Sequence, residues 1–198
     1  MGTITRTLAN NLTTGLGAGE ANDFKLIKTV TITSATAYAD FIHGSSDVVF
    51  DSTYKRYKVV ISNFNLANSS TVWGIRWMES GSVVSSSDYI VAGHGIEDSD
   101  QEHKTSTSSG MDYGRLGTRN TAYSSTHNEV CEIILEDPTS SRYKTAVSLN
   151  GGMCGNDVAG VYQCVAVLKR TQTANGFRIM PSAGNIDTAT ISLYGLKS

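Results

Sequence analysis

The stretch KLIKTVTIT, residues 25–33, decides how the rest of the sequence is interpreted. Its side chains alternate with a period of two, which places Leu26, Val30 and Ile32 on one face of the stretch, opposite Ile27. This period is the signature of a β-strand that buries one face. The stretch therefore predicts that the main body of the chain is built from strands.

Similar apolar bursts follow along the chain, each bounded by Gly, Asn, Asp, Ser or Pro, which supply turn geometry. The further predicted strands span residues 57–66, 71–78, 88–92, 129–136, 142–149, 161–170, 177–180 and 188–196. Sequential strands with occasional long connections favour an all-β, antiparallel β-sandwich that is jelly-roll-like. We expect residues 24–198 to form this single domain, preceded by an extended N-terminal arm over residues 1–23.

Two tryptophans lie on one face of the predicted strand TVWGIRWM, residues 71–78. Trp73, Ile75 and Trp77 share this face. Aromatic rings can stack on the apolar faces of sugars, so the pair could form a sugar platform. An ordinary core stripe explains the same pattern and is the favoured interpretation.

One long segment, residues 93–127, lacks the alternation of its surroundings and is rich in Gly, Ser, Asp and His. A polar segment of this length inside a compact domain is usually functional, so we expect an irregular insert and a contact surface here. Tyr89, Tyr113 and Tyr123 lie near or within it and are the candidate receptor contacts. A simple crossover between sheets is the alternative.

Composition and charge exclude several classes of protein. Only 17% of the 198 residues are charged, below the roughly 25% of ordinary soluble domains, while 24 Ser and 22 Thr supply the polarity. The net charge of −2 and the lack of clustered cations argue against nucleic acid as a partner. The sequence contains neither a run of about 20 apolar residues nor the apolar core of a signal peptide, so we expect no membrane insertion.

The sequence offers little chemistry. Cys131, Cys154 and Cys164 match neither a metal clasp nor a disulfide framework and are interpreted as buried hydrophobes in a reducing compartment. The acidic, histidine-containing stretch 94–103 could hold a cation, but its spacing matches no calcium loop. No nucleophile elbow or zinc-protease motif is present. A carboxylate pair for glycoside hydrolysis could come together only in the fold, and the candidates are Asp88, Asp98, Asp112, Glu129, Glu132 and Glu136. We therefore predict a protein that is no enzyme and uses no metal or cofactor.

The N-terminal arm, residues 1–23, differs from the rest by its Thr, Asn and Gly content, which makes an isolated helix marginal. Its apolar residues recur at wide spacing, so we expect the arm to become ordered by docking on a partner. A floppy terminus is the alternative. The predicted partner-binding residues of the arm are Ile4, Arg6, Leu8, Asn10, Asn11, Leu12 and Leu16.

Four segments together resemble a known family. The closing segment GFRIMPSAGNIDTATISLYGLKS, residues 176–198, resembles that of bacteriophage virion structural proteins of the tail-fibre, capsid-fibre or decoration type, which reads SGNI, a few small residues, then LYG. DSTYKRY at 51–57 and EDPTSSRYKTAVSLNG at 136–151 are similar to the family's strand start and central segment. GTITRTLANNLTT at 2–14 looks like its N-terminal leader.

The resemblance implies a non-enzymatic β-sandwich displayed on a phage capsid or tail and made in the host bacterial cytoplasm. Its partners would be other virion proteins, bound through the arm, and copies of itself, with a trimer favoured because trimers are common in fibres and decorations. The alternative is a tail-fibre module that binds a host-surface glycan. Both roles are expectations drawn from the sequence.

Overall fold

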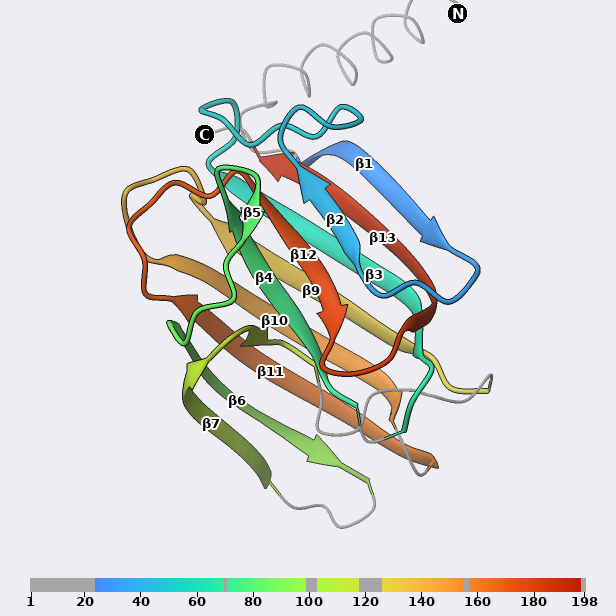
Figure 1. Cartoon of the computed structure of the whole chain (residues 1–198). Coiled ribbons are helices and arrows are strands. Elements are labelled where there is room, and N and C mark those ends of the chain that lie inside the picture. Colours follow the sequence, from blue (N-terminus) through green and yellow to red (C-terminus); the bar gives the residue numbers. More distant parts are fainter. Residues whose placement is uncertain (1–23, 70, 99–102, 118–125, 155–156, 197–198) are drawn as a thin grey trace, which may run out of the picture.

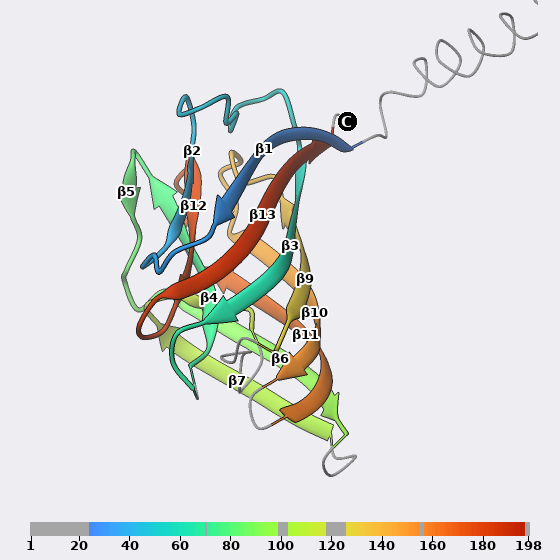
Figure 2. The ribbon, with the colours of Figure 1, turned by 90° about the vertical axis from the view of Figure 1, so that its right-hand side faces the viewer.

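The computed structural model describes residues 24–69, 71–98, 103–117, 126–154 and 157–196. Within these residues the chain forms thirteen β-strands and no α-helix. The strands form two sheets that pack face to face (Figures 1 and 2). The expected all-β, antiparallel sandwich is therefore confirmed, whereas the arm, residues 1–23, lies outside the described residues.

The larger sheet has eight strands, and every neighbouring pair in it is antiparallel. We call it the large sheet. In spatial order its strands are β1 (Phe24–Ile32), β13 (Ile186–Leu196), β3 (Arg56–Leu66), β9 (Glu129–Glu136), β10 (Lys144–Cys154), β11 (Val158–Leu168), β6 (Tyr89–Glu97) and β7 (His103–Met111).

The second sheet, called the small sheet, lies over part of the first. Its order is β2 (Ala39–Ile42), β12 (Gly176–Pro181), β4 (Trp73–Glu79) and β5 (Ser82–Val83), and β8 (Gly114–Arg115) pairs with the other end of β4. The chain crosses between the sheets after β1, β2, β3, β5, β7, β8, β11 and β12, which makes the connectivity jelly-roll-like. Strands β6 and β7 lie beyond the edge of the small sheet (Figure 1).

The core fills the space between the sheets. Trp73, Ile75 and Trp77 of β4 are all fully buried, so the interpretation of this face as a core stripe is confirmed. Across the small sheet the ring of Phe177 stacks on Phe41 with centroids 5.0 Å apart. Because the tryptophan rings face inward, they form no sugar platform.

The alternation of the first strand is interrupted at its start. The pairing of β1 with β13 shifts register between Leu26 and Lys28, the mark of a β-bulge. Ile32 and Val30 therefore face the core together with Ile27, while Leu26 is left exposed. The expected grouping of Leu26 with Val30 and Ile32 is wrong because one extra residue at the bulge reverses the faces.

The segment 93–127 is also more regular than expected. Strand β6 continues to Glu97, β7 covers His103–Met111, and β8 follows at Gly114–Arg115. The expectation of an irregular insert is wrong over these ranges. Thr is β-branched and suits strands, and β7 lies at the edge of the sheet with β6 as its single partner strand, so it forms without the apolar alternation that marks central strands.

No helix in the described ranges is long and apolar enough to cross a bilayer.

Candidate assembly surface

The outward side of the large sheet is aliphatic across four neighbouring strands. Strand pairing aligns Val130 of β9, Gly151 of β10, Val161 of β11 and Ile96 of β6 in one row across the sheet. Val130, Val161 and Ile96 are each about half exposed, at 51%, 49% and 46%. Aliphatic side chains on the surface are ordinary when they are scattered, but a contiguous row is not.

Further rows continue this surface. Leu149, which is 55% exposed, stands two residues before Gly151 on the same face of β10. Leu149 lies in a mixed row with Glu132, Gln163 and His94, and the row beyond it places Ile134, Val147, Val165 and Ala92 side by side. We call the whole set the apolar face; its members are Ile90, Ala92, Ile96, Val130, Ile134, Val147, Leu149, Val161 and Val165.

The relief of the apolar face is uneven. An open hollow is lined by residues that include Val130, Glu132, Leu149, Gly151 and Val161, and a second one by residues that include His94, Val147 and Val165. At Gly151 an added Cβ would meet only the carbonyl oxygen of Gly160, at 3.7 Å. The missing side chain therefore leaves a notch between Val130 and Val161, next to the projecting Leu149.

One ion pair stands on the β9 side of the apolar face. Glu132 lies between Val130 and Ile134 on the outward side of β9, beside Leu149, and its Oε1 lies 2.7 Å from Lys58 Nζ of β3.

The two central strands of the face are free of such pairs. Further along β9, Arg56 Nε lies 2.7 Å from Glu136 Oε2. Among the described residues of β6, β10 and β11, the sole Asp, Glu, Lys or Arg side chains are Glu97 and Lys144, and both are buried. The outward sides of β10 and β11 therefore carry none of these charged side chains.

The outward side of the small sheet is different. Arg178 of β12 forms a bidentate pair with Asp40 of β2, with N–O distances of 2.7 and 2.8 Å. Its guanidinium lies 3.3 Å from the centre of the Tyr38 ring. On the next strand Arg76 faces Arg178 and pairs with Asp112. The hydrogen bonds to Asp40 raise the pKa of Arg178, so its guanidinium stays protonated.

The structure separates the three tyrosines that were expected to contact a receptor. Tyr89 is fully buried; its hydroxyl accepts a hydrogen bond from Trp77 N (2.9 Å) and donates one to Val84 O (3.1 Å). Its expected exposure is therefore wrong, because strand alternation turns it inward at the start of β6. Tyr113 is partly buried and packs over Gly74, and Tyr123 lies outside the described residues.

Two other tyrosines of the described residues are exposed. Tyr38 is 44% exposed and Tyr143 is 55% exposed. Tyr38 precedes the short strand β2, which carries no clear alternation in sequence, and Tyr143 stands just before β10. Neither position carries a sequence signal that would have separated it from a core tyrosine.

The candidate arm residues Ile4, Arg6, Leu8, Asn10, Asn11, Leu12 and Leu16 lie outside the described residues, so their docking stays a prediction.

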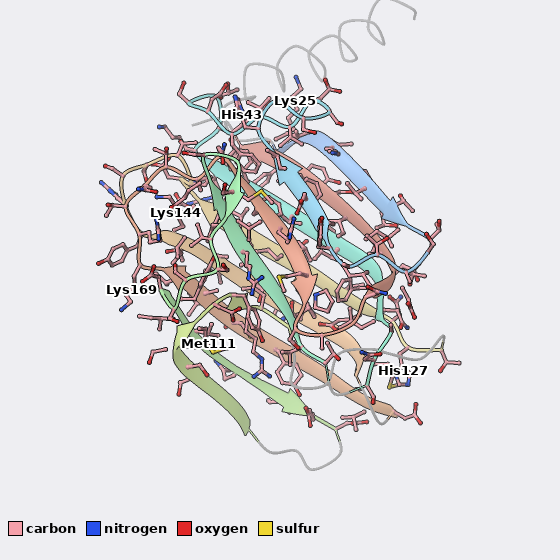
Figure 3. The ribbon with its side chains drawn as sticks, viewed as in Figure 1. Lys25, His43, Met111, His127, Lys144 and Lys169 are labelled. Atoms are coloured by element: carbon pink, nitrogen blue, oxygen red, sulfur yellow. The ribbon has the colours of Figure 1, made fainter. Side chains whose placement is uncertain are left out.

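Buried polar groups lie at opposite ends of the large sheet, where Figure 3 labels Lys144 and His127. The Lys144 ammonium donates to the carbonyl oxygen of Ser140 at 2.7 Å, and burial lowers its pKa. At the other end the Trp73 indole N–H donates to Glu129 Oε1 at 3.2 Å, and His127 Nε2 lies 2.7 Å from Asp157 Oδ1. These groups hold the ends of the sandwich together.

The carboxylates considered for hydrolysis all have partners within the chain. Glu132, Glu136 and Asp112 form the ion pairs described above, and Glu129 accepts from Trp73. Asp88 pairs with Arg170 at 3.6 Å, and Asp98 accepts a hydrogen bond from Ala159 N at 3.1 Å. Each carboxylate therefore has a structural role in the described fold.

Two of the three cysteines are described as side chains. Cys131 and Cys164 are free thiols buried in the large sheet, as interpreted from sequence. Desolvation by burial raises the pKa of both thiols, which keeps them protonated and unreactive. The part of the chain that the structure describes holds no group of three His, Cys, Asp or Glu side chains placed to bind a metal.

Comparison with known proteins gives little. No protein-family model matches the chain, and no curated protein matches it. Among solved structures it is similar to an exo-inulinase from Aspergillus awamori, at 13% identity and a TM-score of 0.41, covering 88% of this chain but only 30% of that one. It is also similar to the CBM40 of a Ruminococcus gnavus IT-sialidase bound to α2,3-sialyllactose, at 11% identity and a TM-score of 0.27, covering 84% and 91% of the two chains. With TM-scores this low, neither likeness carries an argument about function.

Proposed function

We propose that this protein is a non-enzymatic structural subunit of a bacteriophage virion, a β-sandwich displayed on the capsid or tail. The observation that carries an assembly role is the apolar face. Exposed aliphatic side chains gathered over four neighbouring strands, with no charge on the outward sides of the two central strands, are typical of protein–protein interfaces. The phage class rests on the resemblance of the four sequence segments.

In this proposal the subunit has two attachments. Residues 1–23 anchor it to another virion protein, with Leu8, Leu12 and Leu16 filling apolar pockets of that partner. The apolar face supplies the second contact, to a neighbouring subunit. The protein is synthesised in the host cytoplasm, with its thiols reduced, and is incorporated into the particle after folding.

A glycan-binding role keeps less support. Sugar recognition relies on exposed aromatic rings, and Trp73, Trp77 and Tyr89 are all buried. Among the described residues the exposed aromatic rings are those of Phe24, Tyr38 and Tyr143, and one face of Tyr38 is occupied by Arg178. We therefore place assembly ahead of receptor binding.

Immunogold electron microscopy of purified particles tests the proposal, with an antibody raised against residues 24–198. Gold over the head or the tail is expected, and tail-only label would bring receptor contact back as a function. A variant that lacks residues 1–22 should fold normally, as circular dichroism would report, yet fail to label particles. The virion assignment would be overturned if purified particles carry no gold label and disrupted particles also give no signal with the antibody on a blot.

A further inference from the structure

We infer that the apolar face is covered by the same face of a second copy of this chain, in a two-fold contact. The inference rests on the proposed function, because it names the neighbour that this face contacts. The chemistry of the face, its relief and its size each favour such a contact.

The chemistry of the face fits an aliphatic partner. The outward sides of its two central strands, β10 and β11, offer mainly Val, Leu and Ala side chains together with the uncharged Gln163, so they can neither pair charges nor satisfy a phosphate. The carboxylate within the face, Glu132, is paired with Lys58, and Glu136 further along β9 is paired with Arg56. Interfaces between copies of one chain are more apolar than transient interfaces, and this face has that character.

The relief of the face is self-complementary. Leu149 projects from β10, and the notch at Gly151 lies two residues further along the same strand and face. A two-fold axis between these positions would seat Leu149 of the partner subunit in the notch, while Leu149 of the first copy fills the partner's notch. Such reciprocal contact is the defining property of an isologous interface. It favours a two-fold contact over the threefold arrangement expected from the resemblance.

The size of the face is that of a small specific interface. Neighbouring strands lie about 4.8 Å apart and each residue advances about 3.3 Å, so the four strands from β9 to β6 over seven residues offer about 440 Å² in projection. Side-chain relief enlarges this area to about 500 Å² per copy, close to the roughly 1,000 Å² in total that a specific interface needs. Two sheets can pack face to face at about 10 Å, as they do inside sandwiches.

Light scattering coupled to size-exclusion chromatography, on the full-length protein at micromolar concentration, tests the inference. The wild type should have the mass of two copies, or a multiple of two. Leu149→Arg places two like charges across the axis, and Gly151→Leu fills the notch while keeping the face apolar. Each variant should weaken self-association by roughly 100-fold or more, the effect of losing an interface hot spot.

Leu26→Arg is the matched control. Leu26 is 53% exposed, close to the 55% of Leu149, and lies on β1, four strands away from β10 in the same sheet. It should keep the wild-type mass. Gly151 needs no positive φ and faces open space, so its variant should also fold, and thermal unfolding of all three variants checks this.

Three results would overturn the inference: a monomeric wild type, a three-copy mass, or a wild-type mass for both Leu149→Arg and Gly151→Leu. The inference and the proposed function fail separately. A monomer that is nevertheless found on particles would remove the two-fold contact and leave the virion role. A dimer that responds to the variants but is absent from particles would leave the two-fold contact and remove the virion role.

Discussion

The two sheets of this sandwich share one core, but their outward faces differ in chemistry. The small sheet presents a row of ion pairs, in which Arg178 joins Asp40 and Arg76 joins Asp112. The large sheet presents Val130, Leu149 and Val161 at about half exposure. A sheet needs one buried face to fold, so the apolar character of the second face of the large sheet is not explained by folding.

The contrast shows where a contact surface lies when no pocket or cofactor marks it. Ion pairs such as those of Arg178 keep a face hydrated and discourage association. Exposed aliphatic rows invite association and are otherwise an aggregation hazard. The outward sides of β10 and β11 carry no charged side chain although the chain has 34 charged residues in all, 16 Lys and Arg and 18 Asp and Glu. The following substitutions test this comparison in order of decreasing expected effect on the free energy of unfolding.

Removing a side chain from the shared core should affect both faces together. Trp77 is fully buried, and its ring packs edge-on against Phe177 with the ring centroids 6.4 Å apart and an interplanar angle of 75°. Trp77→Ala should lower the free energy of unfolding by about 3–5 kcal/mol, because it leaves a large cavity between the sheets. Urea titration followed by circular dichroism measures this, with Tyr143→Ala at an exposed site as the control. Equal midpoints for the two variants would contradict the assigned core.

Breaking the ion pair of the small sheet should have a moderate effect. Arg178→Ala removes the bidentate partner of Asp40 and the cation stacked on Tyr38. We expect a loss of about 1–2 kcal/mol, since the pair is only partly shielded from water. Arg178→Lys should recover part of it, because lysine keeps the charge but not the two-pronged geometry. A loss that is the same for both variants would show that the geometry of the pair does not matter.

Breaking the border pair of the large sheet should matter less. Glu132 is 56% exposed in its pair with Lys58, so water screens the interaction. Lys58→Ala should change the free energy of unfolding by about 0–1 kcal/mol, and added salt should reduce the difference further. Chemical unfolding at low and high salt measures both. If Lys58→Ala lowers the free energy of unfolding as much as Arg178→Ala does, the ion pairs of the two faces contribute equally to stability and the contrast between the faces is contradicted.

The smallest effect on folding is expected at the centre of the apolar face. Leu149→Ser at dilutions where the protein is monomeric should change the free energy of unfolding by no more than about 0.5 kcal/mol, because the side chain is exposed there. At high concentration the wild type should gain stability from association and the variant should not. Unfolding curves at two protein concentrations check this. A large loss in the monomer would place Leu149 in the fold and not at an interface.

Much of the fold could be predicted from the sequence. All nine strands expected from alternation are present, and the buried stripe of Trp73, Ile75 and Trp77 follows from its period of two. The strands missed are those without an apolar period, namely the short β2, β5 and β8 and the Ser- and Thr-rich β7. Alternation identifies strands that bury one face, so short pairings and edge strands escape it.

The candidate site could not be predicted in the same way. The apolar face exists because Val161 of β11 lies beside Ile96 of β6, and their register joins segments 65 residues apart in the chain. Within β9, the sequence EVCEIILE has apolar residues on both faces, which was a signal, but a single strand does not show what its neighbours contribute. The prediction that Tyr89 is exposed was wrong for a similar reason. The sequence around Tyr89 does not show that the first position of β6 faces the core.

Hydroxyl-radical footprinting with mass spectrometry tests the central claim most directly. The full-length wild type at high concentration is compared with the Leu149→Arg variant, using oxidation of Val161 and Ile96 on the apolar face and of Tyr38 on the small sheet. The account predicts that Val161 and Ile96 are protected in the wild type and oxidised in the variant, while Tyr38 is oxidised equally in both. Equal oxidation of Val161 and Ile96 in the two proteins would contradict the apolar face as a contact surface.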